Sequence, residues 1–451
     1  MADIAVPAAR GTFFGEPRAL GFLAFTEAWE RFSYYGMTGL LVLYMSQQLF
    51  LPGHVEHVAG FAAFRAGIEG VFGKMSTLAL ASQVFGLYTG FVYLTPLLGG
   101  LIADQLIGRR NAVMLGAILM SGGHIAMAFD ASFLLALALL ITGCGLLKGN
   151  ISAQVGGLYA QDDAAGRTRG FSIFSMGINV GATAGPLVCG LLAQMFGWHA
   201  GFGLAGVLML MGLATYIAGY RSLSETTQQV TASKPEAPVA AGQGIVIAAL
   251  FAVMALSIFQ SIAYYQNSNI GLIWINDHVD LMLLGYSIPV SWFNSIDSFV
   301  SIVSVPILFA LWTRQAARGG EPGEVGKIAT GAWIAALSNL LLVAGCMLWT
   351  RVPVLVPVIY DIGLGVAFLY YWPTLLALVS RAAPPGLKST LMGVAFLTLF
   401  VANTTIGRLG ALYEQMTPAQ FWGLHAAIAA VGGVLATLAR GPLERLFAKH
   451  S

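Results

Sequence analysis

The sequence predicts an all-α integral membrane protein. Hydrophobic residues make up 57% of the 451 residues and charged residues only 9%, whereas an ordinary soluble domain has roughly 25% charged residues. The mean hydropathy is +0.77, and 55 residues are glycine, which is frequent in closely packed membrane helices. So few charges cannot cover the surface of a soluble fold. The composition therefore excludes a soluble enzyme, a nucleic-acid binder and a secreted disulfide scaffold. It also predicts that the protein is embedded in a lipid bilayer.

Apolar segments long enough to span a bilayer recur along the whole chain. A spanning helix needs about 20 predominantly apolar residues. Twelve segments meet this requirement: 18–50, 75–105, 111–130, 132–160, 167–197, 199–221, 244–275, 285–312, 327–350, 352–382, 387–415 and 418–440. Several of them exceed 25 residues, so they must tilt, kink or project from the bilayer.

The longest polar stretch divides these helices six and six. Residues 222–243 are rich in Ser, Thr, Gln, Ala and Pro, which is typical of a flexible linker. The sequence thus predicts an N-terminal six-helix bundle over 1–221 and a C-terminal one over 244–451. The loop 51–74 has an amphipathic pattern and is expected to lie on the membrane surface.

The basic residues predict the orientation. With the N-terminus in the cytoplasm, most of the 22 Lys and Arg residues fall in cytoplasmic segments. Both termini are therefore expected in the cytoplasm, with the helices in the plasma (inner) membrane. The N-terminus lacks the order of basic, apolar and small residues that marks a cleaved signal peptide, so we expect the first helix to remain.

A few ionisable residues interrupt the predicted spans. A charge at the bilayer centre costs at least ~2.5–3.5 kcal/mol on insertion scales, so such residues usually have a function or a partner. They are Glu27, Glu30 and Arg31 in the first helix, Lys148 in the fourth, Asp297 in the eighth and Asp361 in the tenth. The three cysteines are too scattered for a metal site, and the histidines form no ligand cluster, so no metal or other cofactor is expected.

The first-helix cluster favours proton coupling. Glu27, Glu30 and Arg31 are three or four residues apart, so they share a helix face and can pair. The nearby arginine favours the ionised form of a carboxyl group, whereas removal from water favours its protonated form. Because these two effects oppose each other, such a carboxyl group can exchange its proton when a neighbouring group moves. That is what a proton-coupled carrier requires. The alternative is a structural ion triad that fixes the first helix to its neighbours.

The overall plan resembles that of the major facilitator superfamily. Two six-helix halves joined by a long linker are typical of this fold, in which the substrate site lies near the midplane between the halves. Residues 99–110, GGLIADQLIGRR, resemble the tight turn that follows the second helix in that superfamily. The resemblance implies a major facilitator fold with 12 transmembrane helices.

Four motifs make the resemblance more specific. Residues 27–36, EAWERFSYYG, resemble the ExxERFxYYG motif of the proton-dependent oligopeptide transporter (POT/PTR) family. Residues 88–100, 145–152 and 171–181 resemble that family's second, fourth and fifth helices, in the same order. The sequence is therefore identified as a member of this family, with the better match over 18–221.

The resemblance implies a function and a set of site residues. The function is import of di- and tripeptides by alternating access, driven by protons, with no other cofactor, by a protein expected to be monomeric. Glu27 and Glu30, with Arg31, would couple the proton. Arg31 and Lys148 would receive the substrate carboxylate. The further contacts would be Tyr34, Tyr35, Tyr88 and Asn179.

The second half departs from the family pattern. Tyr265 stands before Gln266 where the family has an acid, and Phe368 replaces a glutamate that faces the peptide amine. Asp297 replaces a family asparagine, so it is the better candidate for holding an amine or pairing with Lys148. Asp361 could either line the substrate cavity or have a structural role. Gln266 is a further candidate for contact with the substrate.

These departures keep other functions open. One alternative is a divergent member of the family that carries another small amine- or carboxylate-bearing compound. Another is a receptor or membrane enzyme on the same scaffold. An enzyme would need a nucleophile–base pair or a metal constellation, and the sequence presents neither.

Overall fold

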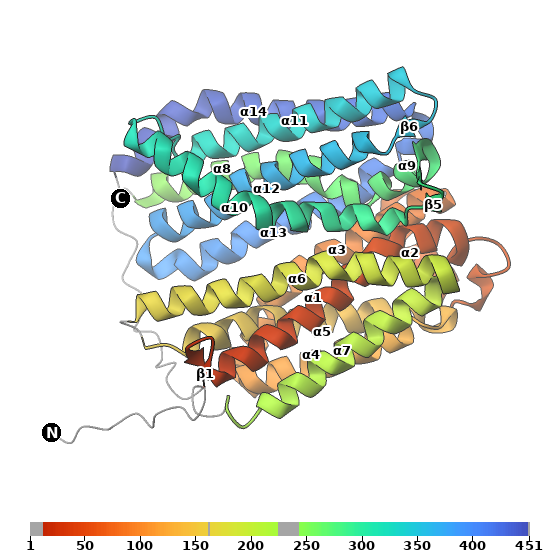
Figure 1. Cartoon of the computed structure of the whole chain (residues 1–451), viewed down its shortest axis with the longest axis horizontal. Coiled ribbons are helices and arrows are strands. Elements are labelled where there is room, and N and C mark those ends of the chain that lie inside the picture. The colour runs from red at the N-terminus through yellow and green to blue at the C-terminus, as the bar shows by residue number, and fades with distance from the viewer. Residues whose placement is uncertain (1–11, 161–162, 224–242, 450–451) are drawn as a thin grey trace.

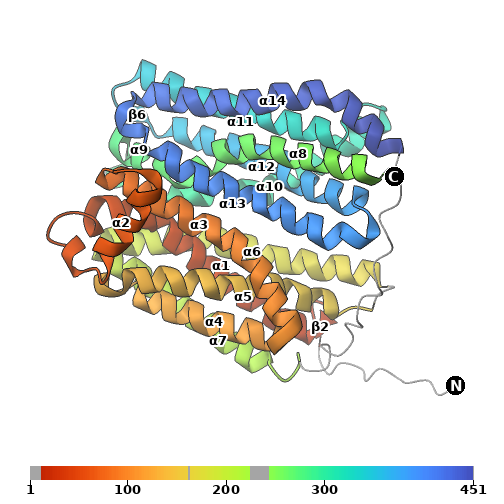
Figure 2. The same ribbon diagram turned by 180° about the vertical axis from the view of Figure 1, so that it is seen from behind.

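The computed structural model describes residues 12–160, 163–223 and 243–449. The structure is mainly helical, and the long helices lie roughly parallel or antiparallel to one common axis (Figure 1). The helices before the linker gather in the lower part of Figure 1 and those after it in the upper part. Figure 2 shows the same division from behind. This architecture confirms the prediction of an all-α membrane protein with a major facilitator fold.

The first set of helices precedes residue 223. It consists of α1 (Arg18–Tyr44), the short α2 (Phe61–Phe72), α3 (Thr77–Ile102), α4 (Arg109–Ala126), α5 (Phe133–Gly157), α6 (Ala164–Phe196) and α7 (Trp198–Gly219). Two short antiparallel strands, β1 (Thr12–Phe13) and β2 (Glu16–Pro17), precede α1.

The second set follows residue 243. It consists of α8 (Gln243–Tyr265), α9 (Ile270–His278), α10 (Asn294–Ala317), α11 (Glu324–Leu348), α12 (Leu355–Ala382), α13 (Lys388–Gly410) and α14 (Pro418–Lys449). Strands β3 (Val279–Asp280) and β6 (Val352–Pro353) pair in parallel, and β4 (Met282–Leu283) and β5 (Tyr286–Ser287) form a hairpin.

Ten helices in the described part of the chain are long and apolar enough to cross a membrane. They are α3, α5, α6, α7, α8, α10, α11, α12, α13 and α14, with short extensions. The other two predicted spans are also helical, as α1 and α4. Charged side chains lower their hydropathy: α1 contains the Glu27, Glu30 and Arg31 cluster, and α4 begins with Arg109 and Arg110.

Two predicted spans differ from the observed helices. The segment 244–275 is not one helix, because residues 266–269 (Gln-Asn-Ser-Asn) interrupt it between α8 and α9. Asn and Ser hydrogen-bond to nearby backbone and so favour caps and turns over helix interiors. The segment 285–312 begins its regular helix only at Asn294, because the β4–β5 hairpin and a short 3₁₀ turn come first, and the helix continues to Ala317.

Glycines allow α1 and α6 to pack closely. A Cβ on Gly181 would lie 2.3 Å from the Ala28 carbonyl oxygen, and one on Gly185 would lie 2.4 Å from that of Phe32. Small residues four apart let two membrane helices approach backbone to backbone. This contact fixes the face of α1 that carries the ionisable cluster.

The two ends of the helix bundle differ in the segments that they carry. The linker end is the end at which α7 finishes and α8 begins, on the left of Figure 1. The far end carries α2 and α9, on the right. At the far end, α2 has only Phe61 and Ile68 buried, and Arg65 pairs with Glu69 at 2.8 Å.

Candidate functional site

The first-helix cluster is a buried ion triad. Arg31 places its Nε 2.8 Å from Glu27 Oε1 and 2.7 Å from Glu30 Oε2, and all three side chains are at most 3% exposed. The Arg31–Glu27 contact is also a hydrogen bond. Glu27 Oε2, Glu30 Oε1 and Arg31 Nη2 have no hydrogen-bond partner among the described residues. The triad has one negative charge in excess and unused hydrogen-bonding atoms, so it can bind a proton or a further cation.

Aromatic rings surround a lysine beside the triad. Lys148 on α5 holds its Nζ 4.7 Å from the centre of the Tyr93 ring and 5.9 Å from that of Tyr34. The Tyr34 ring in turn stacks with Tyr88 and meets Tyr35 edge-on, with centroids 6.5 and 5.1 Å apart. Within the described chain Lys148 makes no ion pair. Its charge is held by cation–π contacts and stays available to an incoming anion.

An acid faces this group from the second half. Asp297, in the first turn of α10, accepts a hydrogen bond from the Tyr264 hydroxyl and another from the Ser298 amide. The start of α10 lies against α1 of the first half, because a Cβ on Gly39 would lie 3.3 Å from Asn294 Nδ2. The Tyr93 and Tyr265 hydroxyls are 3.2 Å apart and join α3 to α8. The first half thus contributes two bases and two acids, of which only Lys148 is outside the triad, and the second half contributes the acid Asp297.

Three predicted site residues lie outside this group. Asn179 is half-buried on α6, and its side chain makes no hydrogen bond in the described ranges. Gln266 and Asp361 are completely buried. The side-chain oxygens and nitrogen of these two residues lack hydrogen-bond partners among the residues the structure describes. Asp361 lies beside Asn267, in the break between α8 and α9.

The predicted pairing of Asp297 with Lys148 is not observed. The ion pairs of the described residues do not join them, and Tyr264 takes the position next to Asp297. Tyr93 and Tyr264 are site residues that the sequence reasoning did not single out. One signal could have found them: a tyrosine inside a span needs a partner for its hydroxyl group.

The two halves touch closely at the far end. A Cβ on Gly86 of α3 would lie 2.4 Å from the Asn403 carbonyl oxygen of α13, and Ser82 donates to the Gly407 carbonyl oxygen at 3.2 Å. The 3₁₀ turn before α10 meets α6 similarly, where Trp292 Nε1 donates to the Leu187 carbonyl oxygen at 2.9 Å. These contacts close the far end.

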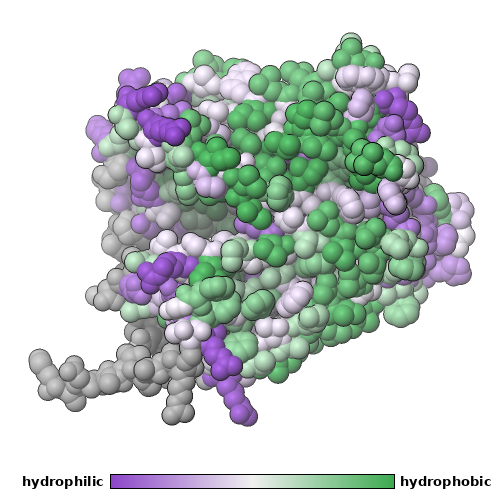
Figure 3. Space-filling view, viewed as in Figure 1, coloured by the Kyte–Doolittle hydropathy of each residue, from purple (hydrophilic) through white to green (hydrophobic). Residues whose placement is uncertain are grey.

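The linker end is open by comparison. A shallow groove of ≈ 420 Å³ runs along α6 there, lined by Arg167, Thr168, Phe171, Ser172 and Ser175. The space-filling view shows the surface hollowed between the upper and lower helices on the left (Figure 3). The linker end thus carries a surface hollow, whereas the contacts above close the far end. A carrier that alternates its access would show this arrangement as one of its two states.

The sequence pattern of the POT family matches residues 110–241 and 245–423. The chain therefore belongs to the POT family, a family of membrane transporters and not of enzymes.

Relatives and solved structures agree with this assignment over nearly the whole chain. Peptide transporter YePEPT of Yersinia enterocolitica is 28% identical, over 96% of each chain. A di-/tripeptide transporter of Lactococcus lactis is 26% identical, over 96% of this chain and 97% of that one. An uncharacterized transporter of Bacillus subtilis, YclF, is 28% identical over 94% of each. Crystal structures of a peptide transporter POT with sulfate, and of a variant of it with alafosfalin, superpose with TM-scores of 0.84 at 26% and 27% identity, each covering 97% of both chains.

Proposed function

We propose that this protein is a symporter that imports di- and tripeptides together with protons. The observation that carries the proposal is one cation without an ion-pair partner among the described residues, Lys148 in the first half, together with one acid in the second half, Asp297. A short peptide carries a carboxylate at one end and an ammonium at the other, so it complements this arrangement. The related di-/tripeptide transporters support the same substrate class.

Each site residue receives a role in the proposal. Lys148 binds the peptide carboxylate as a mobile point charge, and Arg31 orients it from within the triad. Asp297 binds the ammonium group. The tyrosines form rigid walls with polar tips. They are Tyr34, Tyr35, Tyr88, Tyr93 and Tyr264.

Glu27 and Glu30 bind the coupling proton in this proposal. The triad has two carboxylates for one guanidinium, so a proton on one carboxyl makes it neutral. Placing both termini in the cytoplasm of a plasma (inner) membrane makes the open linker end cytoplasmic and the closed far end external. The protein then acts as a monomer, with one site between its two halves.

A second candidate substrate class rests on a specific observation. Tyr265 and Phe368 occupy the two positions where the family pattern has acids, and Phe368 stacks on Tyr264 with centroids 5.0 Å apart. The amine side of the site therefore has aromatic rings at these two positions and keeps Asp297 as its acid. This favours a divergent member that carries another small amine- or carboxylate-bearing compound.

Uptake of labelled dialanine into proteoliposomes with an inward proton gradient tests the proposal. We expect saturable uptake that a protonophore abolishes. The variant Glu27→Gln should lose the dependence on the gradient. Glu69→Gln is a matched control, because Glu69 also pairs with an arginine four residues away at 2.8 Å, but on the exposed α2.

Absence of dialanine uptake by folded protein would refute the peptide assignment. A thermal-shift screen of amines and organic acids would then identify the second substrate class. If Glu27→Gln and Glu69→Gln lost proton coupling equally, the assignment of the proton site to the triad would be refuted.

A further inference from the structure

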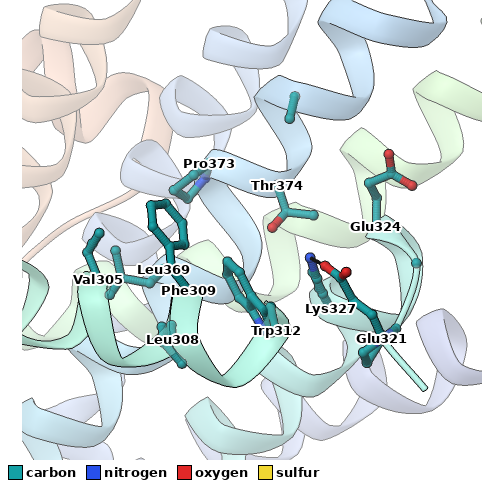
Figure 4. A pocket seen from close by; sticks show the side chains of 13 residues that line it. Val305, Leu308, Phe309, Trp312, Glu321, Glu324, Lys327, Leu369, Pro373 and Thr374 are labelled. Atoms are coloured by element: carbon teal, nitrogen blue, oxygen red, sulfur yellow. Dashed lines mark hydrogen bonds and ion pairs between the residues drawn. The ribbon is translucent and has the colours of Figure 1, made fainter. Parts of the chain in front are cut away.

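A separate cavity lies among α10, α11 and α12 at the linker end. It encloses ≈ 580 Å³ (Figure 4). Its lining is formed by Val305, Leu308, Phe309, Trp312, Glu321, Pro322, Gly323, Glu324, Lys327, Leu369, Pro373, Thr374 and Ala377. None of these residues belongs to the site between the halves.

The cavity is polar near the helix ends and apolar toward the middle of the bilayer. Glu321 and Glu324 stand where α11 begins, whereas Val305 lies twelve residues before the end of α10 at Ala317. Twelve helical residues span about 18 Å. The polarity of the cavity therefore changes along the direction of the membrane normal, as the polarity of a phospholipid does.

The polar end offers both signs of charge. Lys327 Nζ lies 2.6 Å from Glu321 Oε1 and 4.1 Å from the centre of the Trp312 ring. Figure 4 shows Lys327 and Glu321 beside each other, with Thr374 facing them from α12. Glu324 pairs with Arg381 outside the lining, at 2.9 Å. The acids and bases of this group balance, so an electrically neutral ligand with both charges fits better than an anion.

One polar atom of the lining has no partner. The buried Trp312 Nε1 lacks an acceptor within the described ranges. A buried donor without an acceptor costs free energy, so it marks a position where an acceptor on a ligand is favourable. Lys327 provides a charged donor for a phosphate group, and Trp312 Nε1 provides a second donor when the indole ring turns toward the cavity. The free carboxylate lone pairs of Glu321 can accept from an ammonium.

The exposed face of α10 continues the apolar part. Phe309 is 59% exposed and Ile307 61% exposed, and only 11% of the apolar window of this helix is buried. This apolar face is part of the front surface in Figure 3. An acyl chain that leaves the cavity can follow it without meeting a charged side chain.

From these observations we propose that the α10–α12 cavity binds a phospholipid with a primary amine, that is, a phosphatidylethanolamine. The phosphate lies against Lys327 and Trp312, the ammonium against Glu321, and an acyl chain between Phe309 and Leu369. The proposal does not depend on the transported substrate.

Native mass spectrometry of the delipidated full-length protein tests it. The probes are phosphatidylethanolamine, phosphatidylcholine and phosphatidylglycerol with the same acyl chains. We expect phosphatidylethanolamine to bind about tenfold more tightly than phosphatidylcholine, the ratio given by one charge-assisted hydrogen bond that a trimethylated amine cannot donate. Glu321→Gln should remove this preference.

Two more variants divide the site into its parts. Trp312→Phe keeps an aromatic ring but removes the five-membered part of the indole with its N–H, so it should weaken the binding of both phosphatidylethanolamine and phosphatidylglycerol. Ala377→Phe narrows the cavity and should reduce all three adducts. Asp104→Asn is the matched control, since Asp104 pairs with Arg109 at 2.9 Å near the linker end, on other helices.

The outcomes separate the proposal from its alternatives. Equal adducts for the three lipids, unchanged by Trp312→Phe and Ala377→Phe, would mean unspecific boundary lipid and would overturn it. Displacement of phosphatidylethanolamine by dialanine would show that the cavity takes a free zwitterion, which also overturns it. Loss of the preference for phosphatidylethanolamine in Glu321→Gln, with the preference retained in Asp104→Asn, supports the proposal.

Discussion

Replacing Lys148 by methionine should separate substrate recognition from folding. Lys148 makes no ion pair in the described chain and is held only by the Tyr93 and Tyr34 rings. A cation–π contact at a partly exposed site contributes about 0.5–1 kcal/mol, and methionine keeps the length and the apolar contacts. The two contacts together therefore set the expected loss in unfolding free energy at no more than about 2 kcal/mol.

The same substitution should strongly weaken the binding of a carboxylate. A hydrogen bond to a charged group contributes about 1.5–3 kcal/mol, so the affinity for dialanine should fall about 10- to 150-fold. Lys148→Arg, which keeps the charge, should retain part of the affinity.

Isothermal titration calorimetry with two ligands measures this effect. Dialanine amide has the same amine but no carboxylate, so Lys148→Met should leave its affinity nearly unchanged. Thermal unfolding of the same preparations reports stability. A parallel loss for dialanine and its amide, or an unchanged affinity for dialanine, would refute the assignment of the carboxylate to Lys148.

Three further substitutions test the architecture around the site. Arg31→Ala leaves two carboxylates without their guanidinium and should destabilise the fold by about 3–5 kcal/mol, as thermal unfolding would report; an unchanged midpoint would contradict the buried triad. Tyr265→Phe removes the hydroxyl contact with Tyr93 between the halves but keeps the ring, so the maximal uptake rate should change while the unfolding temperature stays nearly constant; an unaltered rate would exclude a role in the conformational cycle. Gly86→Ala places a methyl group 2.4 Å from the Asn403 carbonyl oxygen, so it should prevent tight closure and increase labelling of far-end cysteines introduced beside the contact; unchanged labelling would contradict the proposed seal.

The sequence was sufficient for the fold and for the contacts within the first-helix triad. The triad follows from spacing alone, because residues three and four apart share a helix face. Charges are so rare in this chain that each one inside a span was visible as an exception. The major facilitator fold follows from the six and six arrangement of apolar segments.

Features that depend on partners from distant segments could not be predicted in the same way. The interruption after Tyr265 lies in an apolar segment, where four polar residues do not lower the hydropathy enough to separate two helices. The contact of Tyr264 with Asp297 depends on the register of α8 against α10. A tyrosine within a span is compatible with packing, with the membrane interface or with a site, and only the tertiary structure distinguishes these cases.

The far-end seal has a consequence for the speed of the cycle. At Gly86 and Gly407 backbone lies against backbone, and beside this contact the Ser82 and Trp292 side chains donate to carbonyl oxygens of the other half. Where backbone meets backbone, the two surfaces can separate and meet again without a side chain changing its rotamer. Opening therefore breaks a few side-chain hydrogen bonds and exposes the backbone surface between them to water, so the barrier to opening should respond to hydration and osmotic pressure. Such a seal can be watertight when shut and still turn over quickly.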